Sequence, residues 1–104
     1  MIKIYKIPNE KLQEAKKVLE NPDVTTNNWA RNGYTLRDAK IIGFDENCNY
    51  LYVKAIEEFF QQNEKQITSI EGVAILEGEE FEKVKNKIEE EQDSTASGIG
   101  AIFG

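Results

Sequence analysis

Histidine is absent from this chain of 104 residues, and cysteine occurs only once, as Cys48. Histidine and cysteine are the ligands of structural zinc sites, so the chain cannot build such a site by itself. Without histidine, serine, threonine and cysteine nucleophiles also lack their usual activating base. One cysteine excludes an intrachain disulfide. The composition therefore favours a protein of the reducing cytoplasm that is not an enzyme.

Long apolar runs and positive charge are also scarce. No stretch approaches the about 20 apolar residues of a membrane-spanning helix, and the start of the chain alternates instead of forming a signal-type apolar run. Lys and Arg total 13 against 19 Asp and Glu, which gives a net charge of −6. Because nucleic acids and anionic membranes attract cations, we expect neither as a partner. The glycines form no G-x-G-x-x-G pattern, and we expect no cofactor.

Apolar periodicity predicts a single domain of the α+β class. The predicted strands cover residues 2–7, 34–44, 50–55 and 70–77, and the predicted helices cover 9–19, 56–67 and 79–92. A tight polar turn over residues 45–49 joins the second and third strands into a hairpin. The order matches the ferredoxin-like βαββαβ sandwich, an antiparallel sheet with helices on one face. A C-terminal helix and a tail follow.

The predicted sheet has one face that the two main helices leave open. Tyr5, Tyr50 and Tyr52 are expected on that face, and the last helix packs either on it or on a sheet edge. Between the first two strands, Trp29 is expected on a short helical turn closed by Asn32 and Gly33.

The end of the chain is expected to differ from the domain over residues 1–92. Residues 93–97 read Asp-Ser-Thr-Ala-Ser, the composition of a flexible linker. They lead to an uncharged apolar tip whose contact residues would be Ile99, Ile102 and Phe103. Burial of each side chain contributes about 1.5–3 kcal/mol, against about 1–2 kcal/mol for ordering each backbone residue. The tip can therefore pack on its own domain, bind a partner or a second copy, or stay unstructured.

A second candidate site surrounds the two arginines, Arg31 and Arg37. They bracket Tyr34 and follow Trp29, and arginine is suited to bidentate capture of carboxylate or phosphate. The segment therefore predicts a site for a small ligand or an anion. The alternative is a surface ion pair of Arg37 with Trp29 packed over the core.

A third pattern, Asp45, Asn47 and Asn49, reproduces the opening of a calcium-binding loop, in which alternate oxygens converge on the cation. The rest of the loop departs from that pattern. Tyr50 stands where the sharp turn needs glycine, and Ile56 stands where a bidentate glutamate belongs. Because Asp and Asn are common turn residues, an ordinary hairpin turn explains the segment as well as weak calcium binding does.

Three segments resemble those of a family of small archaeal proteins without an assigned activity. They are Leu51–Lys54 with Glu57–Phe60, Leu76–Glu80, and Gly98–Gly104. The resemblance covers nearly the whole chain and implies a cytoplasmic protein with a helical layer against an antiparallel sheet. It transfers no catalytic residue. We therefore expect a protein-binding or scaffold module that uses its C-terminal tip, with a small-ligand regulatory domain as the alternative.

Overall fold

The computed structural model describes residues 1–21 and 28–103, and for residues 93–103 it describes the backbone alone. The strands are β1 (Ile2–Pro8), β2 (Thr35–Asp38), β3 (Cys48–Lys54) and β4 (Ala74–Ile75). The helices are the 3₁₀ turn η1 (Asn9–Lys11), α1 (Leu12–Leu19), α2 (Asn28–Asn32), α3 (Glu57–Thr68) and α4 (Gly78–Phe103). The elements follow one another in the order β1-η1-α1-α2-β2-β3-α3-β4-α4.

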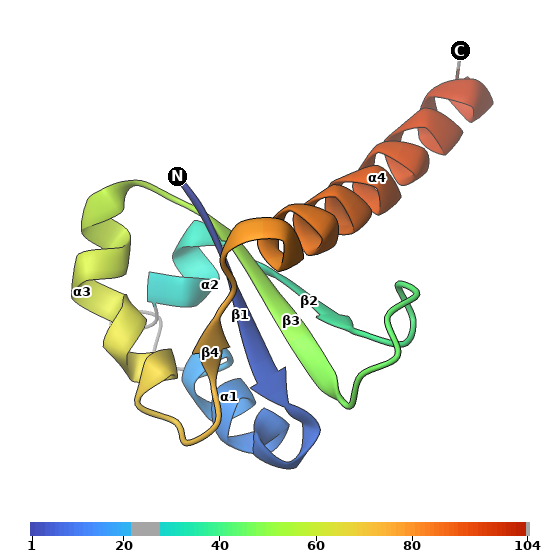
Figure 1. Ribbon diagram of the computed structural model, residues 1–104. Coiled ribbons are helices and arrows are strands. Elements are labelled where there is room, and N and C mark those ends of the chain that lie inside the picture. Colours follow the sequence, from blue (N-terminus) through green and yellow to red (C-terminus); the bar gives the residue numbers. More distant parts are fainter. Residues whose placement is uncertain (22–27, 104) are drawn as a thin grey trace.

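The four described strands form one antiparallel sheet in the order β2-β3-β1-β4 (Figure 1). The central pair runs from Ile2↔Lys54 to Pro8↔Cys48. Each edge strand is short, and β4 pairs with β1 at only two positions, Tyr5↔Ile75 and Lys6↔Ala74. The predicted α+β class with an antiparallel sheet is confirmed, and so is the hairpin of the second and third strands.

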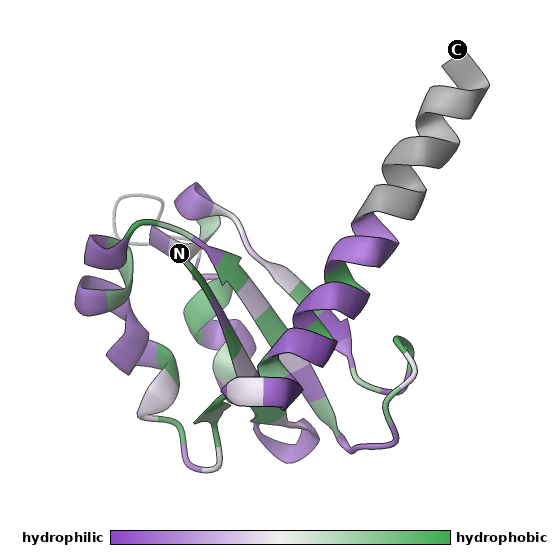
Figure 2. Cartoon of the chain, turned by 45° about the horizontal axis from the view of Figure 1, so that its top comes forward, coloured by the Kyte–Doolittle hydropathy of each residue, from purple (hydrophilic) through white to green (hydrophobic). Residues whose placement is uncertain are grey.

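Helices cover both faces of the sheet, and each face has its own apolar core. The first core joins β1 and β3 to α1, α2 and α3; its members are Tyr5, Ile7, Ala15, Leu19, Trp29, Leu51, Val53, Phe60 and Ile67. The second core lies under α4; its members are Ile4, Ala39, Ile42, Cys48, Tyr50, Tyr52, Leu76, Val84 and Ile88. Apolar residues gather on the strands, and polar residues cover much of α3 and the first half of α4 (Figure 2).

The expectation of a face bearing three tyrosines is wrong. Residues paired across antiparallel strands point to the same face. Tyr5 pairs with Leu51 and belongs to the first core, whereas Ile4 pairs with Tyr52 on the opposite face. Tyr50 also lies on that face, and α4 covers it through Val84 and Ile88. All three tyrosines are buried.

The predicted second strand and the tight turn after it are also corrected. β2 ends at Asp38, whose carboxylate accepts a hydrogen bond from the Lys40 backbone N–H at 2.9 Å. The chain then folds back, because the Phe44 N–H donates to the Ala39 carbonyl at 2.9 Å. Gly43 permits this path with φ of 95°, a conformation that other residues rarely adopt. The connection therefore covers residues 39–47.

Of the other predicted elements, one strand is shorter in the structure, one helical turn is confirmed and the last helix extends further. The predicted strand over 70–77 shortens to β4 because the Val73 N–H donates to the Ile70 carbonyl in a turn, at 3.2 Å. The expected helical turn at Trp29 is confirmed as α2. The backbone of α4 is helical through residues 93–97, where composition favours a linker. The division into a domain over 1–92 and a tail over 93–104 stays a prediction.

Candidate functional site

The predicted site around the two arginines is divided between the faces of the sheet. Trp29 is 1% exposed in the first core, and its indole N–H donates to Gln66 at 2.9 Å. The ring of Phe59 packs edge-on against it, with ring centroids 5.1 Å apart. Tyr34 is partly buried against the same core, and this burial raises its pKa. Trp29 is therefore a core residue, as in the alternative interpretation of this segment.

Arg37 lies on the opposite face from Trp29. Its guanidinium contacts Glu91 of α4 at 3.3 Å and donates to the Leu36 carbonyl at 3.1 Å. Leu36, the preceding residue of β2, packs against the first core instead. Because neighbouring residues of a strand point to opposite faces, β2 cannot bring Arg37 to Trp29. The expected surface ion pair of Arg37 is therefore present.

Arg31 is exposed and lines a shallow cleft between α2 and α3. The cleft has a volume of about 360 Å³ and is lined by Asn28, Arg31, Asn32, Ile56, Glu58, Phe59, Gln62 and Asn63. Four of these side chains are amides. Asn63 is buried, and its amide is already engaged with Asn28 and the Phe59 carbonyl, each at 2.9 Å. Arg31 is thus the one member of the predicted arginine site that lines this cleft.

The three residues of the calcium pattern are placed in two different kinds of structure. Asn49 lies in β3, is 7% exposed, and donates from its side-chain amide to Asn9 at 2.8 Å. The Asn47 carbonyl accepts from the Asn9 backbone N–H at 3.2 Å, while Asp45 lies in the preceding loop. No group of three or more acidic, Cys or His side chains suited to a metal occurs within the described residues. Calcium binding by this segment stays a prediction.

The residues predicted to form the apolar tip are Ile99, Ile102 and Phe103. Their backbone belongs to α4, and their side chains lie outside what the structure describes. The last side chain of α4 that is described, Gln92, donates from its amide to the Thr35 hydroxyl at 3.0 Å. The tip thus begins seven residues after the point where α4 contacts the edge strand β2.

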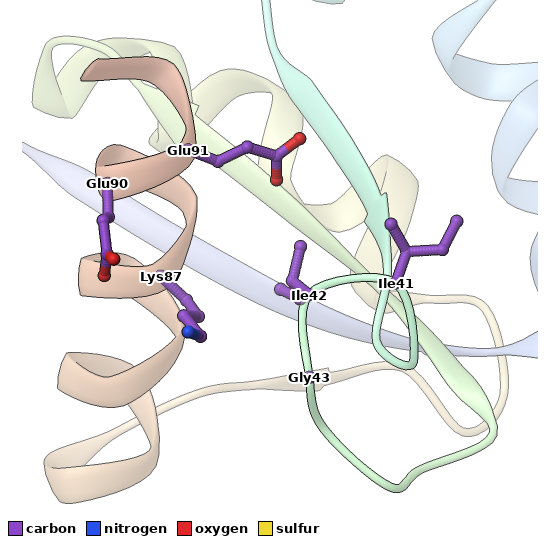
Figure 3. Close-up of a pocket in the computed structure, with 6 residues that line it drawn as sticks. All are labelled: Ile41, Ile42, Gly43, Lys87, Glu90 and Glu91. Atoms are coloured by element: carbon purple, nitrogen blue, oxygen red, sulfur yellow. The ribbon is translucent and has the colours of Figure 1, made fainter. Parts of the chain in front are cut away.

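Beside that contact lies a cleft between α4 and the loop after β2, which we call the α4 cleft. It has a volume of about 400 Å³ and is lined by Ile41, Ile42, Gly43, Lys87, Glu90 and Glu91 (Figure 3). Ile42 points toward α4 and is 7% exposed, whereas Ile41 is 78% exposed. The backbone comes close to α4 at Gly43, where an added Cβ would lie 3.7 Å from Cε of Lys87.

Two tyrosines of the second core bind carboxylates near the α4 cleft. The Tyr52 hydroxyl donates to Glu89 at 2.7 Å, and burial together with this hydrogen bond raises the pKa of Tyr52 to about 12. The Tyr50 hydroxyl donates to Glu46 at 2.6 Å. Lys6 donates to the same carboxylate at 2.6 Å, and these two bonds lower the pKa of Glu46. These contacts hold α4 and the loop before β3 against the sheet.

Cys48 is the first residue of β3 and belongs to the second core, near Tyr50 and Glu46. It is 2% exposed, and burial raises the pKa of its thiol, which keeps the reactive thiolate scarce near neutral pH. The position suits a packing role.

Sequence reasoning missed the residues of the α4 cleft. The residues around Ile41 and Ile42 fit the side-chain alternation of a strand, so the sequence did not indicate that these two isoleucines lie in a turn. Lys87, Glu90 and Glu91 belong to a charged helix segment, which is usually a solvated face. The remaining signal was the adjacent Ile41-Ile42 pair next to Gly43, where a turn would expose one isoleucine and bury the other.

No protein-family model, curated protein or solved structure matches this chain. The described part of the chain contains no helix with the length and apolar character needed to cross a bilayer. The candidate surfaces are the α4 cleft, the Arg31 cleft and the C-terminal part of α4.

Proposed function

We propose that this protein is a non-enzymatic protein-binding module that contacts its partner through Ile99, Ile102 and Phe103. The register of α4 supports the proposal. Val84 and Ile88 pack on the second core, and steps of three or four residues lead from Ile88 through Thr95 to Ile99 and Ile102. Because residues spaced in this way share one face of a helix, the apolar face of α4 repeats near its C-terminal end.

The order of the sheet supports the same proposal. β2 is the edge strand on this side of the described sheet, and Gln92 contacts it at Thr35. Ile99 and Ile102 follow Gln92 by 7 and 10 residues, or about 10–15 Å along a helix axis. An apolar helix face that continues beyond its own sheet has the chemistry of a ligand for a groove on another protein.

The test compares partner recovery by the full chain and by a double variant, Ile99→Ser with Ile102→Ser. The matched control is Ile56→Ser, because Ile56 is 69% exposed in a different region. We expect the double variant to lose proteins that the control retains, and each such protein to bind the purified chain in calorimetry. Equal recovery by the two variants would remove the tip as a contact.

We propose a ferredoxin-like βαββαβ arrangement, supported by the antiparallel sheet with β1 between β3 and β4. The packing of α1 and α3 with one core also supports it. The coverage of the second face by α4 is an addition to that arrangement. The proposed place of action is the cytoplasm, for which the single buried cysteine is the supporting observation.

A second candidate function is the binding of a small anionic ligand in the Arg31 cleft. The favouring observation is that an exposed guanidinium and four amide side chains line one hollow. Thermal-shift screening against small carboxylates and phosphates tests this candidate. Stabilisation that Arg31→Ala removes and Arg37→Ala retains supports it, because Arg37 lies on the other face of the sheet. Stabilisation that survives Arg31→Ala contradicts it.

A further inference from the structure

We propose that Asn32 and Gly33 form a modification site, at which Asn32 loses its side-chain amide as ammonia without the help of an enzyme. They make the only Asn-Gly pair of the sequence, because every other asparagine precedes a residue with a side chain. Deamidation begins when the following backbone nitrogen attacks the side-chain carbonyl carbon, and glycine has no Cβ to obstruct that approach. Both residues are exposed, so water has access to them.

The reaction needs water as its only co-reactant. The backbone nitrogen of Gly33 loses its proton and forms a bond with Cγ of Asn32. The bond between Cγ and Nδ2 breaks, and Nδ2 takes up a proton and leaves as ammonia. Water then opens the cyclic imide at either of its carbonyl groups, which gives aspartate or isoaspartate. Each product adds a negative charge at position 32, and isoaspartate also lengthens the main chain by one methylene.

Three hydrogen bonds restrain the reacting groups in the folded chain. The attacking nitrogen of Gly33 donates to the Trp29 carbonyl at 2.9 Å. The leaving nitrogen, Nδ2 of Asn32, donates to the Gly33 carbonyl at 2.9 Å and to the Lys54 carbonyl at 3.1 Å. The nitrogen of Gly33 and Cγ of Asn32 can react only after these bonds open. The rate of deamidation therefore depends on how often this segment opens.

The site lies at a part of the fold that opens easily. Asn32 is the last residue of α2, a helix of five residues, and helix ends fray. Gly33 follows with φ of 85°, and a Cβ placed there would have no atom within 4 Å. Both bonds of the Asn32 amide are exposed to solvent. Because Trp29 is anchored in the first core, the end of α2 can open while the start of the helix stays in place.

Deamidation removes a contact between α2 and the end of β3. The Asn32 amide donates to the carbonyl of Lys54, the last residue of β3. A carboxylate only accepts hydrogen bonds, so at this position it would face two carbonyl oxygens without a donor. A negative charge is also unfavourable at the C-terminal end of a helix. The modified chain should therefore release the last turn of α2 from β3.

The same reaction changes the charge of the Arg31 cleft. Asn32 is one of the four amide side chains that line this cleft together with the Arg31 guanidinium. A carboxylate at position 32 lies next to Arg31 in the chain and reduces its attraction for an anion. Deamidation would thus act as a slow, irreversible loss of anion binding. This consequence rests on the second candidate function, whereas the modification itself does not.

The first experiment follows the full chain during incubation at mildly alkaline pH, with digestion and mass spectrometry of the peptides. We expect aspartate and isoaspartate to accumulate at residue 32 of the folded chain before any other asparagine is modified. The rate at this residue should increase by about tenfold or more in denaturant, where the three hydrogen bonds are absent. Asn32→Gln is the matched control, because its longer side chain must close a larger ring and should keep its amide.

The outcomes of this experiment are distinct. If the folded chain keeps the Asn32 amide as long as its other asparagine amides, the modification site is overturned. If the rate at Asn32 is the same in the folded chain and in denaturant, the restraining role of the three hydrogen bonds is overturned.

The second experiment measures the effect of the product with Asn32→Asp. The matched control is Asn86→Asp, which makes the same amide-to-acid change at an exposed position of α4. Amide hydrogen exchange reports the bond from the Gly33 N–H to the Trp29 carbonyl, and we expect exchange about tenfold or more faster in Asn32→Asp alone. Equal exchange rates in the two variants would contradict the release of α2. Neither experiment involves the C-terminal side chains, so the proposed protein binding is tested separately.

Discussion

The Tyr52 hydroxyl of the central strand β3 donates a hydrogen bond to the Glu89 carboxylate of α4, with 2.7 Å between the oxygens. The contact joins the middle of the sheet to the helix that carries both the α4 cleft and the proposed C-terminal contact. With Arg37–Glu91 and Gln92–Thr35, it sets where α4 leaves the sheet. The direction of the C-terminal segment therefore depends on polar contacts as well as on the apolar core.

Removal of the Tyr52 hydroxyl should weaken this attachment. Tyr52→Phe loses a hydrogen bond to a charged group, and we expect a decrease of about 1–2 kcal/mol in the free energy of unfolding. Chemical denaturation at pH 7 measures it. The control is Tyr5→Phe, because the buried Tyr5 hydroxyl lies near Glu64 but makes no hydrogen bond of standard geometry within the described residues. Equal losses in the two variants would contradict the role assigned to the Tyr52–Glu89 bond.

Alkaline pH should lower the free energy of unfolding, and the ionisation of Tyr52 contributes to this loss. The pKa of Tyr52 is raised from 10.0 to about 12 in the folded protein, by burial first and Glu89 second. The neutral hydroxyl is thus favoured by folding, and its contribution is complete below pH 10. That contribution is lost as pH rises from about 10 to 12. Burial raises the pKa of Tyr50 in the same direction. Stability measured between pH 8 and 12 should fall less steeply in Tyr52→Phe.

Truncation of Ile88 tests the packing of α4 on the sheet. Ile88 is fully buried in the second core, so Ile88→Ala should lower the free energy of unfolding by about 2–5 kcal/mol. Ile41→Ala, at a position 78% exposed, should change it by less than about 0.5 kcal/mol. Thermal and chemical denaturation measure both. A loss below about 1 kcal/mol for Ile88→Ala would contradict the description of this face as a packed core.

Cys48 should react slowly in the native protein. Its burial and its raised pKa both limit the thiolate available to an aromatic disulfide reagent at neutral pH. Labelling should become fast in denaturant, and the native rate should follow the population of opened molecules. Rapid labelling of the folded chain would show that the second core opens around β3.

Calcium provides a further test of the loop before β3. Because the Asn49 amide is engaged with Asn9, we expect millimolar calcium to leave the backbone amide shifts of residues 45–49 unchanged. Magnesium at the same concentration controls for ionic strength. Shifts confined to Asp45, Asn47 and Asn49 with calcium alone would instead support the calcium pattern.

Much of the fold could be predicted from the sequence, because apolar residues repeat with the period of each helix or strand. Val84 and Ile88 indicate a helix that buries one face, and the alternation of β3 indicates its strand. The second strand was predicted too long because residues 39–44 fit strand alternation, with Ala39 and Ile42 on opposite faces, whereas a turn buries both in the second core. Local alternation cannot distinguish a strand from a turn that places two side chains in the same core.

The candidate sites were harder to predict from the sequence, because neighbours in sequence lie on different faces of the sheet and neighbours in space are distant in sequence. Trp29 and Arg37 are close in sequence, and the alternation of β2 places Arg37 on the opposite face from the core that buries Trp29. The α4 cleft joins residues 41–43 to residues 87–91, which are separated by more than forty positions. No local pattern connects two such segments.

Composition and periodicity were sufficient for the α+β class, the hairpin and the exclusion of a zinc site built by this chain alone. These properties depend on which residues are present and on their spacing over a few positions. The register of β1 against β3, the burial of the tyrosines and the α4 cleft required the folded chain. Each depends on contacts between residues distant in sequence, which form only when the sheet and α4 pack together.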